Sequence, residues 1–241
     1  MDCSTPPQPS AAPMPATLHY FQGRGNSAQC RWALAAAEIP YVSASLISPQ
    51  DFAALRASGK LIFGQVPMLE DGELCVSQSL AIVRHCARRG KLYGMSSADN
   101  ARVDEVIEGI RDARGALVGY PFGDPRQSCM RLGGAVERFF PCFEGMIESN
   151  ASPPFAVGVA LTMADVLLAE IVESTSEAFE ATFGAQAVVQ VLEPFPRLRQ
   201  LHTHVMGLPA IVEFKASANW MPFPAGVAGR EYVRNVRTAM G

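Results

Sequence analysis

The spacing of apolar residues changes near residue 93. Before it, short apolar runs alternate with amphipathic segments, which predicts strands over 17–22, 41–46, 65–70 and 74–76 and helices over 26–37, over 49–58 and from Ser77-Gln78-Ser79 onward. Asp71-Gly72, between the last two strands, is typical of a type I′ hairpin turn. After Gly94 the apolar residues recur at helical spacing, and we expect helices within 98–119, 126–148, 163–178, 185–192, 196–206, 209–216 and 230–240.

This order of elements predicts two domains. The order β-α-β-α-β-β-α is that of a thioredoxin-like domain, so we expect an α+β thioredoxin-like domain over 17–93 and an all-α domain over 94–241. Residues 1–16 are rich in Pro, Ser and Ala without periodicity, and we expect them to form a disordered leader. Thr162 and Asp165 form a Thr-x-x-Asp capping signature, whose expected role is in folding.

Composition and charge argue against several classes of function. A net charge of −3 and a pI near 5.8 give no basic surface for nucleic acid or anionic lipid. The six cysteines include no Cys-x-x-Cys pair, and His202 and His204 point to different sides of a predicted helix, so we expect no metal site. No secretory segment and no apolar run long enough to span a bilayer is visible, and we expect a cytoplasmic protein with reduced thiols.

Tyr20 is the first candidate site residue. It stands at the end of the first predicted strand, directly before the Gly23-Arg24-Gly25 turn and the start of a helix. Ligands of open α/β sheets bind at the carboxyl ends of the strands, which is where this order places the Tyr20 hydroxyl. Spacing alone fits equally a strand tyrosine that packs its ring and satisfies its hydroxyl locally.

Several strings, in order along residues 17 to about 215, resemble one family. They are LHYFQGRG with Arg31-Trp32, FGQVPMLEDGELCVSQSLAI, LYG, IEGIRD, RFFPCFE and LTMADVLLAE. The chain resembles the cytosolic glutathione transferases of the tyrosine type, which comprises the alpha, pi, mu and sigma classes, with alpha the nearest. The resemblance implies a detoxifying enzyme that uses glutathione as co-substrate and needs no metal.

The resemblance implies that Tyr20 is catalytic. In such enzymes the tyrosine at the end of the first strand donates its hydroxyl to the sulfur of glutathione, which favours the thiolate over a thiol that is otherwise mostly protonated. The family also carries a thiolate-stabilising arginine one residue after the Arg-Gly pair, but this chain has Asn26 there. We therefore expect a smaller depression of the thiol pKa than in relatives with the arginine.

The remaining glutathione contacts follow from the same resemblance. The backbone of Val66, before a cis Pro67, would pair with the cysteinyl backbone, and the start of a helix would receive the γ-glutamyl carboxylate. Each position has an alternative interpretation: Pro67 as a trans proline, Arg56 as a solvated helix charge, and Gln78-Ser79 as a plain helix N-cap. The glutathione-binding residues implied are Tyr20, Asn26, Arg56, Gln65, Val66, Pro67, Gln78, Ser79, Asp112 and Arg138.

Three of the implied roles require a second copy of the chain. Asp112 and Arg138 match residues that act across a subunit boundary, and Phe63 matches an aromatic key that inserts into the partner. The resemblance therefore implies a homodimer. In isolation Asp112 and Arg138 would be called surface charges.

The implied reaction is attack of the thiolate on a hydrophobic electrophile. The same thiolate can serve in peroxide reduction or isomerisation, which the sequence does not separate from conjugation. A non-catalytic ligand-binding or structural protein of the same fold is the alternative, and a thioredoxin-type oxidoreductase lacks a cysteine at the helix start, because Cys30 lies inside the helix. The implied electrophile pocket comprises Phe21, Gly23, Val118, Phe122, Tyr232, Val233 and Val236.

Overall fold

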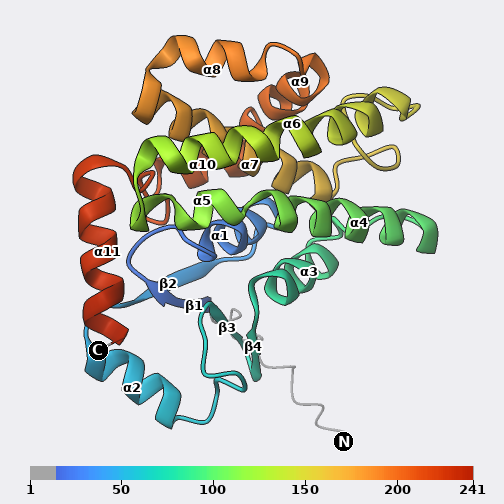
Figure 1. Cartoon of the computed structure of the whole chain (residues 1–241). Helices are drawn as coiled ribbons and strands as arrows, with labels where there is room; N and C mark the ends of the chain where they lie inside the picture. Colours follow the sequence, from blue (N-terminus) through green and yellow to red (C-terminus); the bar gives the residue numbers. More distant parts are fainter. Residues whose placement is uncertain (1–14, 241) are drawn as a thin grey trace, which may run out of the picture.

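The computed structural model describes residues 15–240 (Figure 1). A small sheet with its flanking helices is followed by a larger all-helical part, which confirms the expected fold class. Residues 1–14 of the expected leader lie outside the described residues. Ala16 already belongs to the first strand and is 2% exposed, so the fold begins one residue before the expected boundary.

The four-stranded sheet has the order β2-β1-β3-β4. β1 is parallel to β2 and antiparallel to β3, so it lies inside the sheet, and its last two residues, Tyr20 and Phe21, pair only with β2. The antiparallel β3 and β4 form a hairpin. The elements of this part are β1 (Ala16–Phe21), α1 (Ser27–Ala36), β2 (Tyr41–Leu46), α2 (Pro49–Ala57), β3 (Met68–Asp71), β4 (Leu74–Ser77) and α3 (Ser79–Arg89).

The helical part packs on α1 through the central helix α7, which also contacts α4 and α9. The last helix, α11, leaves this group and runs down beside the sheet to reach α2 (Figure 1). No helix within residues 15–240 is both long and apolar enough to cross a membrane. The elements are α4 (Ser97–Ala113), α5 (Gly115–Gly119), η1 (Tyr120–Phe122), α6 (Pro125–Ser149), α7 (Met163–Phe183), α8 (Ala185–Leu192), α9 (Pro196–Met206), α10 (Pro209–Ala216) and α11 (Gly226–Met240).

Several local details differ from the expectation, among them the start of β3 at Met68 and not at residue 65. The two-residue turn of the hairpin is Gly72-Glu73, because Asp71 already pairs with Leu74. Gly72 has φ +63° but Glu73 is not among the described non-glycine residues with positive φ, so the turn is not of type I′, which needs positive φ at both positions. The expected helix 98–119 is interrupted at Arg114.

The start of α7 is fixed by the predicted capping box. The backbone N–H and the hydroxyl of Thr162 donate to one Asp165 carboxylate oxygen at 2.7 and 2.9 Å, and the N–H of Ala156 donates to the other at 2.7 Å. Asp165 is fully buried. One carboxylate therefore holds both the first turn of α7 and the loop that precedes it.

We predict that Asp165→Ala lowers the free energy of unfolding by about 2 kcal/mol, because three donors lose their acceptor in a buried place. The matched control is Asp99→Ala, which removes the equivalent carboxylate from the more exposed capping box at Ser96. Urea unfolding of both variants measures the difference. Equal losses for the two variants would contradict the role assigned to burial.

Candidate functional site

The end of β1 turns so tightly that a backbone amide meets the Tyr20 hydroxyl. The N–H of Asn26 donates to Tyr20 Oη at 3.0 Å. Gly25 between them has φ +40°, and a Cβ on it would lie 2.3 Å from that hydroxyl. The Gly23-Arg24-Gly25 turn seen in the sequence is therefore a condition for bringing the start of α1 against Tyr20.

A second tyrosine lies against the first. Tyr232 of α11 places its Oη 3.4 Å from Tyr20 Oη, and the two side chains are 5% and 6% exposed. The Tyr232 ring also packs on the turn, since a Cβ on Gly23 would lie 2.2 Å from its Cδ2. The sequence placed Tyr232 in the electrophile pocket, whereas the structure brings its hydroxyl to the candidate catalytic hydroxyl.

Burial controls the protonation of the groups at this site. It raises the pKa of Tyr20, although the hydrogen bonds from Tyr232 and Asn26 work in the opposite direction. Tyr20 therefore keeps its proton at neutral pH and can donate it in a hydrogen bond. Burial likewise raises the pKa of the Cys30 thiol, which is 0% exposed inside α1, so this thiol is protonated and inaccessible.

The edge beside Tyr20 holds several of the implied glutathione contacts. The Val66–Pro67 peptide bond is cis, and Val66 packs against the cluster that contains Tyr20. The side-chain amide of Gln78 donates to that of Gln65 at 3.4 Å, and Ser79 begins α3 directly after Gln78. These contacts bring Gln65, Val66 and Gln78 close to one another and to the Tyr20 cluster.

Arg56 is linked to this edge through Phe52, which was not among the implied site residues. The Arg56 guanidinium lies 5.6 Å from the ring centroid of Phe52, and Phe52 packs edge-on against Phe21 at 5.6 Å. Arg56 itself is exposed. Nothing in the α2 sequence distinguishes Phe52 from an ordinary apolar position.

Most of the implied electrophile pocket gathers around α11. Phe21, Tyr232 and Val236 belong to one buried cluster with Tyr20, and the partly exposed Phe122 packs edge-on against Tyr232 at 5.8 Å. Val118 on α5 and Val233 on α11 are half-buried.

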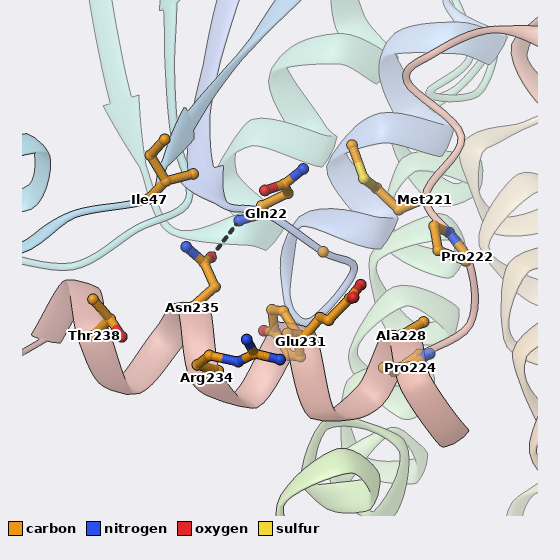
Figure 2. A pocket seen from close by; sticks show the side chains of 12 residues that line it. Gln22, Ile47, Met221, Pro222, Pro224, Ala228, Glu231, Arg234, Asn235 and Thr238 are labelled. Carbon is orange, nitrogen blue, oxygen red and sulfur yellow. Dashed lines mark hydrogen bonds between the residues drawn. The ribbon is translucent and has the colours of Figure 1, made fainter.

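A cavity of about 460 Å³ lies beside α11, between this helix and the segment that contains Met221 and Pro222 (Figure 2). Gly23 and Tyr232 contribute to its wall. Figure 2 shows that Asn235 closes one side, where its Oδ1 accepts from the N–H of Gln22 at 2.8 Å.

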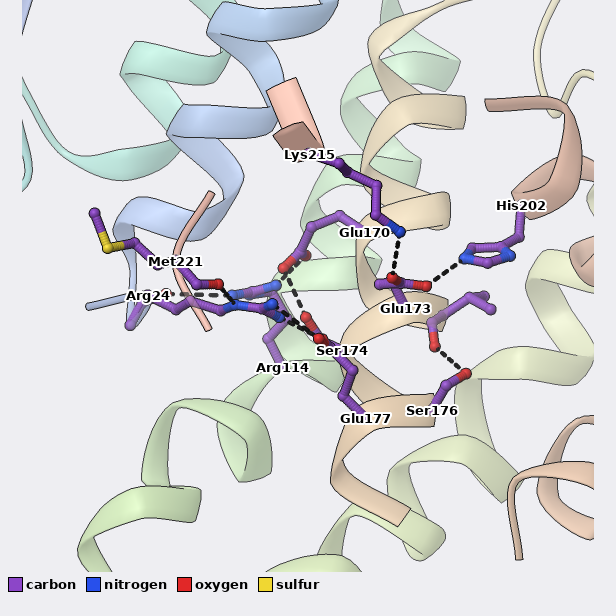
Figure 3. A network of polar contacts seen from close by, with 12 residues as sticks. Arg24, Arg114, Glu170, Glu173, Ser174, Ser176, Glu177, His202, Lys215 and Met221 are labelled. Carbon is purple, nitrogen blue, oxygen red and sulfur yellow. Dashed lines mark hydrogen bonds and ion pairs between the residues drawn. The ribbon is translucent and has the colours of Figure 1, made fainter. Parts of the chain in front are cut away.

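Two arginines tie this region to α7 (Figure 3). Arg24 donates to the Glu177 carboxylate and, through Nε, to the carbonyl of Met221 at 2.6 Å. Arg114 donates to the Glu170 carboxylate and, through Nη2, to the carbonyl of Gly25 at 3.4 Å. Nothing in the sequence singles out Arg114, because a single arginine in an amphipathic segment is usually a solvated charge.

The three residues expected to act across a subunit boundary are exposed on the surface; they are Phe63, Asp112 and Arg138. The carboxylate of Asp112 contacts the neighbouring Arg111, and the Arg138 guanidinium lies 4.9 Å from the Phe139 ring centroid. Phe63 is 63% exposed and follows Ile62, which is 78% exposed. One chain by itself therefore assigns no partner to these three residues.

Comparison with known proteins decides the family. The glutathione S-transferase N-terminal domain model matches residues 16–88, and a glutathione S-transferase C-terminal domain model matches residues 124–218. The chain belongs to the glutathione S-transferase family. Glutathione S-transferase alpha-4 of Rattus norvegicus is 31% identical over 228 residues, which cover 92% of this chain and 96% of the relative. Glutathione S-transferase A3 of Mus musculus is 33% identical and covers 82% of this chain and 86% of its own length.

Solved structures show the same fold as this transferase. The glutathione S-transferase of Ascaris lumbricoides superposes with a TM-score of 0.67 at 25% identity and covers 84% of this chain and 97% of its own. The monomeric Na-GST-3 of Necator americanus superposes with a TM-score of 0.73 at 23% identity and covers 87% of this chain and all of its own. This transferase therefore shares its scaffold with these structures.

We predict that Gly23→Ala releases α11 from the transferase, because the new Cβ would overlap the Tyr232 ring. Hydrogen exchange of the α11 backbone amides should become faster, with smaller changes elsewhere. The control is Gly72→Ala, at a position with positive φ but open space around it. Unchanged α11 exchange in Gly23→Ala would show that Tyr232 does not anchor the helix.

Proposed function

We propose that this transferase conjugates the thiolate of glutathione to hydrophobic electrophiles, with Tyr20 as the catalytic residue. The observation that carries the proposal is the Tyr20 hydroxyl at the carboxyl end of β1, which accepts the Asn26 N–H at 3.0 Å and remains protonated. Family membership supports the choice of glutathione as the thiol. Such conjugation is a detoxification reaction.

In the proposed mechanism the Tyr20 hydroxyl donates to the sulfur of glutathione and stabilises its thiolate. The N–H of Asn26 donates to the same oxygen, which polarises the hydroxyl and strengthens it as a donor. The thiolate then attacks an electrophilic carbon held against the apolar side chains around α11. The rate gain comes from proximity and thiolate stabilisation, without a protein-bound intermediate.

We assign the remainder of glutathione to the edge next to Tyr20. The backbone of Val66 is to pair with the cysteinyl residue, and Ser79 with the start of α3 is to receive the γ-glutamyl carboxylate. Gln65 and Arg56 are to hold the glycyl end. The hydrogen bond between Gln65 and Gln78 supports this assignment, because two of the implied glutathione contacts already lie side by side.

A non-catalytic binding or structural protein is the second candidate, and one observation favours it. Tyr20 is only 6% exposed beneath Tyr232, so a thiol reaches its hydroxyl only if Tyr232 or α11 moves. The two candidates differ in outcome, since only the enzyme turns over an electrophile.

The thiols of Cys30, Cys75, Cys86, Cys129 and Cys142 are unpaired within the described residues, which supports a reducing, cytoplasmic location for either candidate.

We predict that Tyr20→Phe lowers kcat/KM for a chloronitrobenzene by about 10- to 100-fold, because the thiolate loses a hydrogen bond to a charged group worth about 1.5–3 kcal/mol. The control is Tyr93→Phe, which removes a hydroxyl bonded to Asp104 away from the site. Conjugation by the wild type with no loss in Tyr20→Phe contradicts the mechanism. Wild-type protein that binds glutathione without turnover favours the second candidate.

We also propose a homodimer, because the exposed Phe63 and Ile62 form an apolar projection that burial in a partner would cover. In a dimer Asp112 and Arg138 are to reach the neighbouring glutathione site. A solved structure with the same fold is titled monomeric, so the fold alone does not decide the assembly.

We predict that the wild type sediments as a dimer and that Phe63→Ser shifts it toward the monomer, with weaker glutathione binding. Burial of one such ring stabilises an interface by about 1.5–3 kcal/mol. The matched control is Val212→Ser, which removes another exposed apolar side chain, on α10. A monomeric wild type, or a dimer unaffected by Phe63→Ser, would refute the assembly.

A further inference from the structure

The charged side chain of the turn itself, Arg24, is bound to Glu177 on α7 and so is not free to pair with a thiolate held at Tyr20. Asn26 at the N-cap of α1 is neutral and its side chain makes no capping hydrogen bond. The N-terminal end of α1 contributes only the partial positive charge of its dipole. Stabilising an anion in so buried a place calls for a fixed cation nearby.

Arg114 brings a cation to this turn from the helical part of the chain. It lies between α4 and α5, and it is 5% exposed. Its Nη2 donates to the carbonyl of Gly25 at 3.4 Å, and a Cβ on Gly25 would lie 2.3 Å from the hydroxyls of both Tyr20 and Tyr232. A single glycine residue thus separates the guanidinium from the two hydroxyls.

The ion pair between Arg114 and Glu170 has a fixed orientation relative to the turn. Its Nη1 donates to Glu170 on α7, which is 1% exposed and whose other oxygen accepts from Ser174 Oγ at 3.0 Å. The guanidinium bridges the turn and the carboxylate, so the positive end of this ion pair contacts the turn and the negative end lies on α7. An oriented pair in a buried environment is felt by its neighbours even though its total charge is zero.

The other charged and ionisable side chains near the turn are held by other partners or are neutral. Arg31 on α1, which is 2% exposed, donates to the hydroxyls of Ser27 and Ser43. Arg24 is bound to Glu177 on α7 and stacks on the Trp220 ring at 5.0 Å, so it is held by the C-terminal segment. Cys30 on α1 is a buried thiol, and Tyr232 on α11 carries a hydroxyl without charge. Of the charged side chains that the structure describes here, Arg114 is the one whose guanidinium contacts Gly25.

We propose that Arg114 is a positioning residue that supplies, across Gly25, the positive charge that stabilises the glutathione thiolate at Tyr20, in the place of a cation at Asn26. The inference rests on the proposed function. Arg114 touches neither the thiol nor the electrophile: it holds the Gly25 carbonyl and acts through its charge. Glu170 sets the strength of this effect, because it neutralises part of the charge.

The test measures the thiol pKa of glutathione bound to the full chain, from thiolate absorbance against pH. Arg114→Met should raise this pKa by about one unit and move the rising limb of kcat/KM to higher pH, whereas Arg114→Lys should largely restore it. Glu170→Gln, which keeps the shape of the side chain, should lower the pKa, because Arg114 then lacks its counter-charge. A merely structural ion pair would not give shifts of opposite sign.

Two further variants complete the design. Asn26→Arg in the Arg114→Met background should return the thiol pKa toward the wild-type value. Arg84→Met, which breaks a part-buried pair with Asp104 and Glu108 away from the turn, should leave it unchanged. If the wild type binds no glutathione, the proposed function fails. If it does bind but Glu170→Gln leaves the thiol pKa unchanged or raises it, the role of Arg114 is overturned and the proposed function stands.

Discussion

The site depends on one constraint, the close approach of the Gly25 backbone to the Tyr20 hydroxyl. A side chain at this position would overlap both Tyr20 and Tyr232. Because the turn is this tight, the next amide is aimed at Tyr20, and α1 starts directly beside the end of β1. The same turn directs Arg24 away from the sheet toward α7. One local geometry therefore sets the site and links the two parts of the chain.

Helix α7 secures that link with carboxylates that pair with cations from other elements. Glu170 pairs with Arg114, Glu177 with Arg24, and Glu173 with His202 and Lys215 (Figure 3). Burial alone would raise the pKa of Glu173, but the hydrogen bonds and charges of its two partners outweigh burial and lower it to about 2. Buried ion pairs gain little net stability and lose much when one partner is removed. Here the pairs with Arg24 and Arg114 join α7 to the turn, and the pairs of Glu173 join α7 to α9 and α10.

Helix α11 forms a further layer beside the sheet (Figure 1). It packs on α2, β1 and η1 with Tyr232 and Val236 turned inward, and Asn235 binds the backbone at Gln22 and Leu46. Access to Tyr20 therefore depends on how readily this helix moves. The hydroxyl proposed as catalytic is covered by a terminal helix, and this arrangement would couple binding of a thiol to the dynamics of that helix.

The sequence by itself determined the features that depend on near neighbours in the chain. The order of strands and helices, the Thr162–Asp165 capping box, the position of Tyr20 at a strand end and the glycine turn all follow from local periodicity and backbone freedom. Only the tertiary structure decided that Tyr232, 212 residues from Tyr20, reaches its hydroxyl, and that Arg114 is a buried cation at Gly25. The physical reason is that the burial and pairing of a side chain depend on elements distant in the sequence, which no local pattern specifies. The roles proposed for Phe63, Asp112 and Arg138 depend in addition on a second chain.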